Sequence, residues 1–143
     1  MKVIFGKPLD GWIQLDIKSS DQSFADSLSY IPEDFIYKLI ETLNVVSSSE
    51  GQFNLEAYSE PVIYNFTFER KGNDVSFDIS YKEKGNYKNL FHYSEPKNEM
   101  LLTFFRALSK MGNSITADEY EKNWHYEFPK VKLQQLKSYL KPK

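Results

Sequence analysis

The sequence has no cysteine, few glycines and histidines, and no long apolar run. The absence of cysteine excludes disulfide bonds, thiolate nucleophiles and cysteine-ligated metals. The six glycines form no phosphate-binding loop, and the two histidines lack the spacing of a metal site. We therefore expect no cofactor, no metal and no catalytic residue of a recognisable type.

The lack of a long apolar segment also bears on location. The apolar run before Gly6 is too short for the core of a signal peptide, and no window suits a membrane span. A chain without cysteine fits a reducing compartment. The sequence thus predicts a cytoplasmic protein that does not bind a membrane.

Charge is present in both signs but is unevenly distributed. The net charge of −2 argues against general nucleic-acid binding. Residues 129–143 hold five lysines and no acid, so the remaining residues carry thirteen basic and twenty acidic side chains, a net of −7. Such an acidic body could steer a basic partner. The lysines either complement the dipole of a last helix or dock an acidic partner.

The clearest local pattern lies in residues 61–82, where two alternating runs flank a turn at residues 71–74. The apolar stripes are Val62, Tyr64, Phe66 and Phe68 before the turn, and Val75, Phe77, Ile79 and Tyr81 after it. A side-chain period of two predicts paired antiparallel strands with one buried face. Gly72 and Asn73 favour a tight turn between them.

The other periodicities predict the remaining elements. Alternation indicates strands over residues 3–5, 12–19, 53–57 and 90–95, whereas the polar stretch 20–29 is expected to be a connection. Apolar spacings of three and four indicate helices from Pro32, over residues 97–111, from Thr116 to His125 and from Pro129. The expected fold is one α+β domain over residues 1–143. It would be an antiparallel meander of about five strands with helices mainly on one face.

A spaced pattern of packing residues runs through these elements. It consists of Gly11-Trp12, Glu60-Pro61, Tyr64, Arg70, Gly72, Val75, Tyr120, Trp124, Phe128-Pro129, Leu133, Leu136 and Leu140. In this pattern the chain resembles a group of small bacterial proteins of unknown function. The resemblance spans nearly the whole chain and implies a single-domain bacterial protein, with no activity or functional residues attached. The likeness to small acidic α+β immunity proteins is one of general character.

Carboxylates are the most prominent candidates for chemistry. Asp74 and Asp78 are spaced to share a strand face, and Asp16 is expected on a neighbouring strand. Such a cluster could bind a cation or contain a carboxyl group with a raised pKa. Alternation also predicts acids on a solvated sheet face, which is the interpretation we favour. His92 and His125 are expected to be ordinary surface histidines.

These observations favour a non-enzymatic binding protein, in its most concrete form an immunity-like protein that neutralises a toxin with a basic surface. The candidate contacts are Trp12, Asp16, Asp74, Asp78 and Tyr81. The alternative is a small-ligand protein or enzyme with a pocket between sheet and helices, lined by Tyr64, Tyr81, His92 and Tyr93. Homodimerisation through a sheet edge or the last helix is a third hypothesis.

Overall fold

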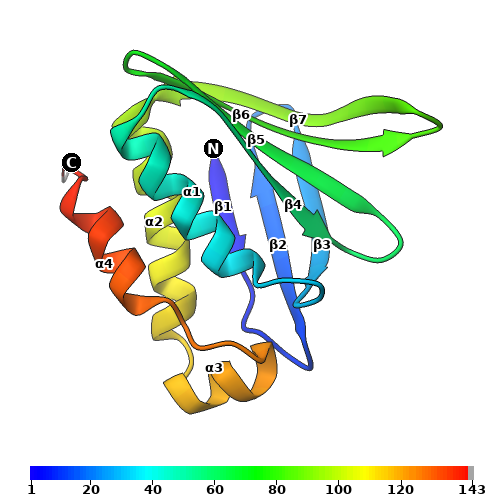
Figure 1. The fold of residues 1–143 in the computed structure, drawn as a ribbon, viewed down its shortest axis with the longest axis vertical. Coiled ribbons are helices and arrows are strands. Elements are labelled where there is room, and N and C mark those ends of the chain that lie inside the picture. The colour runs from blue at the N-terminus through cyan, green and yellow to red at the C-terminus, as the bar shows by residue number, and fades with distance from the viewer. Residues whose placement is uncertain (142–143) are drawn as a thin grey trace.

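The computed structural model describes residues 1–141, which form four helices and two antiparallel sheets (Figure 1). The first sheet has the order β1 (Lys2–Phe5), β2 (Trp12–Lys18), β3 (Ser23–Ser29). The second has the order β4 (Gly51–Tyr58), β5 (Ile63–Lys71), β6 (Asp74–Glu83), β7 (Asn86–Pro96). The helices are α1 (Phe35–Ser48), α2 (Lys97–Asn113), α3 (Ala117–Trp124) and α4 (Lys130–Ser138).

The α+β class is confirmed, but the prediction of one meander of about five strands is wrong. Residues 23–29, expected to be a connection, form β3, which pairs with the whole length of β2. Its inward positions include Asp26 between Phe24 and Leu28, so the apolar alternation is broken in the sequence. Since α1 follows β3 directly, the chain leaves the first sheet before the second begins.

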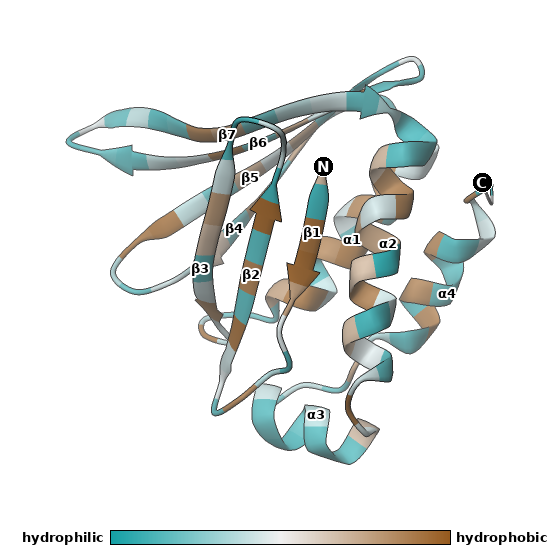
Figure 2. Cartoon of the chain, turned by 180° about the vertical axis from the view of Figure 1, so that it is seen from behind, coloured by the Kyte–Doolittle hydropathy of each residue, from teal (hydrophilic) through white to brown (hydrophobic). Residues whose placement is uncertain are grey.

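Both sheets turn one apolar face toward the helices and share one core. Brown and teal alternate along β2 in Figure 2, as the period of two requires. In the second sheet, the Phe77 ring lies 4.9 Å from Phe68 and 5.2 Å from Phe104 of α2, between ring centroids. These contacts join the hairpin predicted at residues 61–82, now β5 and β6, to the helical layer.

A side-chain amide ties the two sheets together at an exposed edge. Gln22, in the turn between β2 and β3, donates to the His92 carbonyl and accepts from the His92 N–H, both at 2.8 Å. His92 lies in β7, an edge strand of the second sheet. The Gln22 amide therefore satisfies the backbone N–H and carbonyl of one residue on the β7 edge, as a neighbouring strand would.

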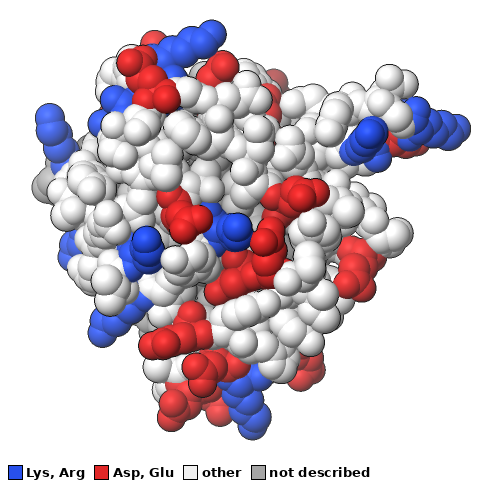
Figure 3. Space-filling model, in the orientation of Figure 1, with Lys and Arg blue, Asp and Glu red and all other residues white. Residues whose placement is uncertain are grey.

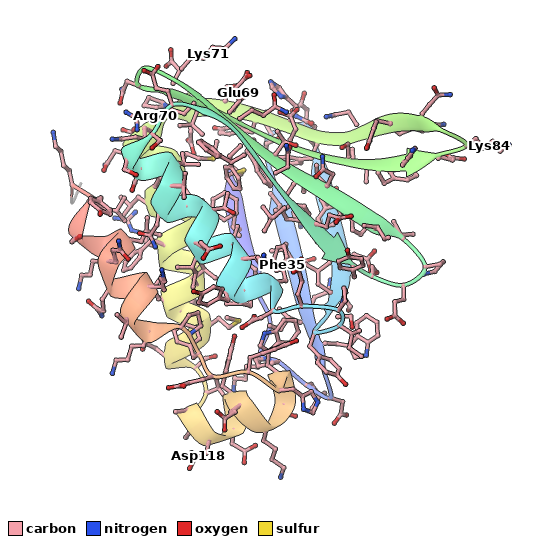
Figure 4. The ribbon with its side chains drawn as sticks, viewed as in Figure 1. Phe35, Glu69, Arg70, Lys71, Lys84 and Asp118 are labelled. Atoms are coloured by element: carbon pink, nitrogen blue, oxygen red, sulfur yellow. The ribbon has the colours of Figure 1, made fainter. Side chains whose placement is uncertain are left out.

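Hydrogen bonds to other elements fix α1 at both ends. Its first turn is capped by Asp34, whose carboxylate accepts from the Tyr37 N–H at 3.2 Å and from Trp124 Nε1 at 2.8 Å. The helix therefore begins after Asp34 rather than at Pro32, where the sequence placed its start. At the other end Arg70 of β5 donates to the Val46 carbonyl at 3.0 Å. Figure 4 shows Arg70 beside that end of α1.

Removal of the Gln22 amide tests how strongly the sheets are tied. Gln22→Ala deletes two hydrogen bonds, so we expect the free energy of unfolding to fall by about 1–2 kcal/mol in urea denaturation. Gln52→Ala on the exposed edge strand β4 is the matched control and should cost less than about 0.5 kcal/mol. Equal losses in the two variants would contradict the role assigned to Gln22.

Asp34 predicts a pH dependence of stability. Burial raises its pKa, against the lowering effect of the Trp124 and Tyr37 hydrogen bonds. The folded state therefore holds the Asp34 proton more tightly than the unfolded chain, and this contribution to stability is lost as the pH rises through the folded pKa. Asp34→Asn removes this titration while an amide oxygen can still cap the helix.

The stability of Asp34→Asn relative to wild type should accordingly improve between pH 4 and pH 7, to be measured by denaturation at both values. Asp34→Ala loses the cap and leaves Trp124 Nε1 without its acceptor, so it should cost about 1–3 kcal/mol at both pH values. A difference between Asp34→Asn and wild type that is the same at both pH values would show that Asp34 does not titrate as described.

Candidate functional site

A groove of about 670 Å³ lies between the exposed side of α1 and the second sheet, and we call it the acidic groove. Its lining includes three carboxylates, two lysines and three tyrosines: Glu33, Glu41, Glu56, Lys38, Lys82, Tyr64, Tyr81 and Tyr87. Figure 3 shows carboxylates gathered on this face of the molecule. Aromatic rings and acids thus meet in one concave surface.

One wall of the acidic groove is a projecting hairpin. It comprises residues 80–90, from the end of β6 to the start of β7, and we call it the arm. Its turn is made by Lys84 and Gly85, both with positive φ, and Figure 4 shows Lys84 at the tip, away from the body of the protein. The pairing register shifts between Ile79 and Ser80, so Leu90 is an extra residue on β7. Such a bulge increases the local twist of the hairpin and carries the arm out from the sheet.

The carboxylates of the acidic groove are only partly neutralised. Glu33 lies 3.6 Å from the Lys38 ammonium. Within residues 1–141, neither Glu41 nor Glu56 forms an ion pair. Partial burial, together with the neighbouring Glu56 carboxylate, raises the pKa of Tyr58 at the edge of this region. Lys82 also lines the groove without an ion pair in the described residues, so three carboxylates and two lysines give the lining a net charge of −1 beside its tyrosine side chains.

The floor of the acidic groove is held by a hydrogen bond between the two sheets. The Tyr64 hydroxyl donates to the carboxylate of Asp26 on β3, and the Tyr64 ring meets Phe24 edge-on at 5.0 Å between centroids. Burial, followed by this hydrogen bond, raises the pKa of Tyr64. Tyr64 pairs with Tyr81 across β5 and β6, so the floor continues into the arm.

The structure separates the five residues expected to contact a partner. Tyr81 lines the acidic groove, whereas Trp12 is 38% exposed at the start of β2. Asp74 and Asp78 lie on one face of β6, as their spacing predicted, because Val75 and Phe77 point into the core. Asp16 belongs to the first sheet, so the expected neighbourhood of Asp16 with these two acids is wrong.

The four residues of the alternative pocket are also divided. Tyr64 and Tyr81 come together in the acidic groove. His92 points to the outer face of the second sheet, where Nδ1 lies 2.7 Å from the Asp78 carboxylate. Tyr93 packs against the shared core from β7. A pocket formed by all four side chains is therefore not present in residues 1–141.

Of the residues that line the acidic groove, sequence reasoning named Tyr64 and Tyr81 and missed the others, among them Glu33, Glu41, Glu56 and Tyr87. Glu41 is an outward position of a correctly predicted helix, and Glu56 is an outward position of a correctly predicted strand. The periodicity predicts that each of these two side chains faces outward. It does not predict that the outward faces of α1 and β4 meet, because that depends on the tertiary fold.

The chain was compared with family models, with curated proteins and with solved structures, and none of the three comparisons finds a match. Residues 1–141 contain no group of three or more histidine, aspartate or glutamate side chains arranged to hold a metal ion. In the same residues, no helix combines the length and apolar character needed to cross a membrane. The geometry of the acidic groove is thus the main guide to function.

The floor of the acidic groove can be tested by removing one hydroxyl group. Tyr64→Phe takes the donor away from the partly buried Asp26 carboxylate, so we expect a loss of about 1–2 kcal/mol in unfolding free energy. Tyr81→Phe removes a hydroxyl that bonds to Glu83 in the arm at 3.0 Å, and it should cost less than about 0.5 kcal/mol. Chemical denaturation of both variants measures the difference. An unchanged stability of Tyr64→Phe would contradict the assigned role.

Proposed function

We propose that this protein is a binding protein that captures a basic segment of another protein in the acidic groove, in the manner of an immunity protein that neutralises a toxin. The observation that carries the proposal is that Glu41 and Glu56, which form no ion pair within residues 1–141, meet an exposed tyrosine in one concave surface between α1 and the arm. The proposal includes the cytoplasmic location that the sequence predicts.

Charge favours a basic occupant. Glu41 and Glu56 have no cation within ion-pair distance among the described residues, whereas Glu33 is already paired with Lys38. Outside residues 129–143 the chain carries a net of −7, which adds a long-range attraction for a cationic partner. Complementary charge of this kind raises association rates and excludes acidic competitors.

The aromatic lining favours a protein segment over a free cation. Tyr87 on the arm is 67% exposed, and Ile63, which also lines the groove, is 46% exposed. Tyrosine supplies a large contact area at a small entropic cost, and its ring face attracts lysine and arginine. A side chain of either type could place its aliphatic stem on Tyr87 and its charge near Glu56.

Homodimerisation by strand pairing along the β7 edge is less favoured than capture of a partner. Gln22 already occupies the backbone groups of His92, and the Leu90 bulge interrupts the edge nearer the tip. The arm also carries Lys84 at its tip and Lys88, whose ammonium lies 3.5 Å from the Glu83 carboxylate. Bulges and lysines are the devices by which edge strands avoid pairing with one another.

The proposal is tested with a fluorescein-labelled peptide of alternating lysine and alanine, measured by fluorescence anisotropy against the full chain. The lysine peptide should bind at low ionic strength and more weakly as salt is added, and a glutamate–alanine peptide should not bind. Glu41→Gln with Glu56→Gln should weaken binding about twofold to thirtyfold, since exposed charge pairs each contribute about 0.2–1 kcal/mol.

The matched control is Asp118→Asn with Glu121→Gln, which removes the same charge from exposed positions on α3. Figure 4 places Asp118 on α3, at the end of the molecule away from the arm. This control should bind the lysine peptide as wild type does. If both double variants lose affinity equally, the attraction comes from net charge alone and the acidic groove is not the site.

A further inference from the structure

A second concave surface lies between α2, α3 and α4 and has a volume of about 410 Å³. We call it the helix cleft. It does not share a residue with the acidic groove. Its volume falls within the range of small-molecule sites, which often lie between packed helices.

The floor of the helix cleft is apolar and well defined. Phe105 and Ile115 line it from the side of α2, and Phe128 and Leu133 from the side of α4. A Cβ atom at Gly112 would lie 2.6 Å from the Phe128 ring, so glycine at this position lets the ring pack directly on α2. The Phe128 ring also meets Tyr120 edge-on, at 5.1 Å between centroids.

One polar group in the lining has no partner. Tyr120 is 1% exposed, and its hydroxyl forms no hydrogen bond with any described residue. A buried hydroxyl without a partner costs free energy and calls for an explanation. Burial, followed by the negative charge of Asp34, raises the pKa of Tyr120.

The rim of the helix cleft carries a surplus of positive charge. Lys130 and Lys137 are seven positions apart on α4 and line the cleft on the same face as Leu133. Neither lysine forms an ion pair within the described residues. Glu127 is the single carboxylate of the lining. Lys130 and Lys137 belong to the five C-terminal lysines noted in the sequence, of which Lys143 lies outside the described residues.

We propose that the helix cleft binds a small amphipathic carboxylate, with its apolar body on Phe105, Phe128 and Leu133 and its anionic group at Lys130 and Lys137. The apolar floor requires an apolar body. The two lysine ammonium groups are donors, so hydrogen bonding and charge both favour an acceptor group. This site is independent of the acidic groove and carries the opposite charge.

Octanoate is the probe, with octylammonium as a control that has the same chain and the reverse charge. Both are titrated into the isotopically labelled full chain and followed by amide chemical shifts. Octanoate should shift resonances of the second half of α2, the start of α3 and α4, and octylammonium should not. Lys130→Ala with Lys137→Ala should weaken octanoate about tenfold, as expected for loss of two exposed charge contacts.

Two further variants make the experiment decisive. Lys122→Ala with Lys132→Ala changes the net charge equally at positions outside the cleft and should leave octanoate affinity unchanged. Ser109→Trp, at a partly exposed position on α2, should fill the cleft and abolish the shifts. The proposal is overturned if octanoate shifts no cleft resonance, if octylammonium binds as well, or if Ser109→Trp retains the affinity.

Discussion

The anchoring of α1 at its two ends is the constraint on which the rest of the structure depends. Asp34 and Trp124 bind its start to α3, and Arg70 binds its end to β5. Between these points the apolar stripe of α1 must lie over the second sheet, and its outward face forms one wall of the acidic groove. α1 has no basic residue in its last turn, so Arg70 supplies from another element the positive charge that the helix C-terminus favours. A change that released either end would move the groove as well as the helix.

The charges of the protein are segregated by this arrangement. Within residues 1–141, Glu41 and Glu56 line the groove between α1 and the arm without an ion pair, beside Lys82, while Lys130 and Lys137 line the cleft between α2 and α4 without an ion pair, beside Glu127. α4 is held against α1 by a hydrogen bond from the Asn44 side chain to the Lys132 carbonyl at 3.1 Å. The ligands proposed for the two surfaces are therefore of opposite charge. The net charge of −2 does not show this uneven distribution, so the proposals rest on the local charges of each surface.

Much of the fold could be predicted from local patterns, and the parts that could not have identifiable causes. The hairpin of β5 and β6 was clear because eight alternating apolar residues flank a glycine turn, and α3 was clear because Thr116 caps it. β3 was missed because Asp26 occupies an inward position, where it accepts from Tyr64 of the other sheet. The start of α1 was placed too early because proline suggested it, whereas the Asp34 side chain determines it. The groove was missed because Glu41, Glu56 and Tyr87 come from three elements whose meeting depends on the whole chain.

The most direct test of the central claim is a map of amide chemical-shift changes on the labelled protein when the lysine–alanine peptide is added. The account predicts changes concentrated along the acidic groove, in residues 33–42 of the α1 region, 54–56 of β4 and 81–87 of the arm. These changes should fade as ionic strength rises, since they depend on exposed charges. Changes centred instead on the outer face of the second sheet around Asp78, or on the acidic surface of α3, would contradict the claim that the acidic groove is the binding surface.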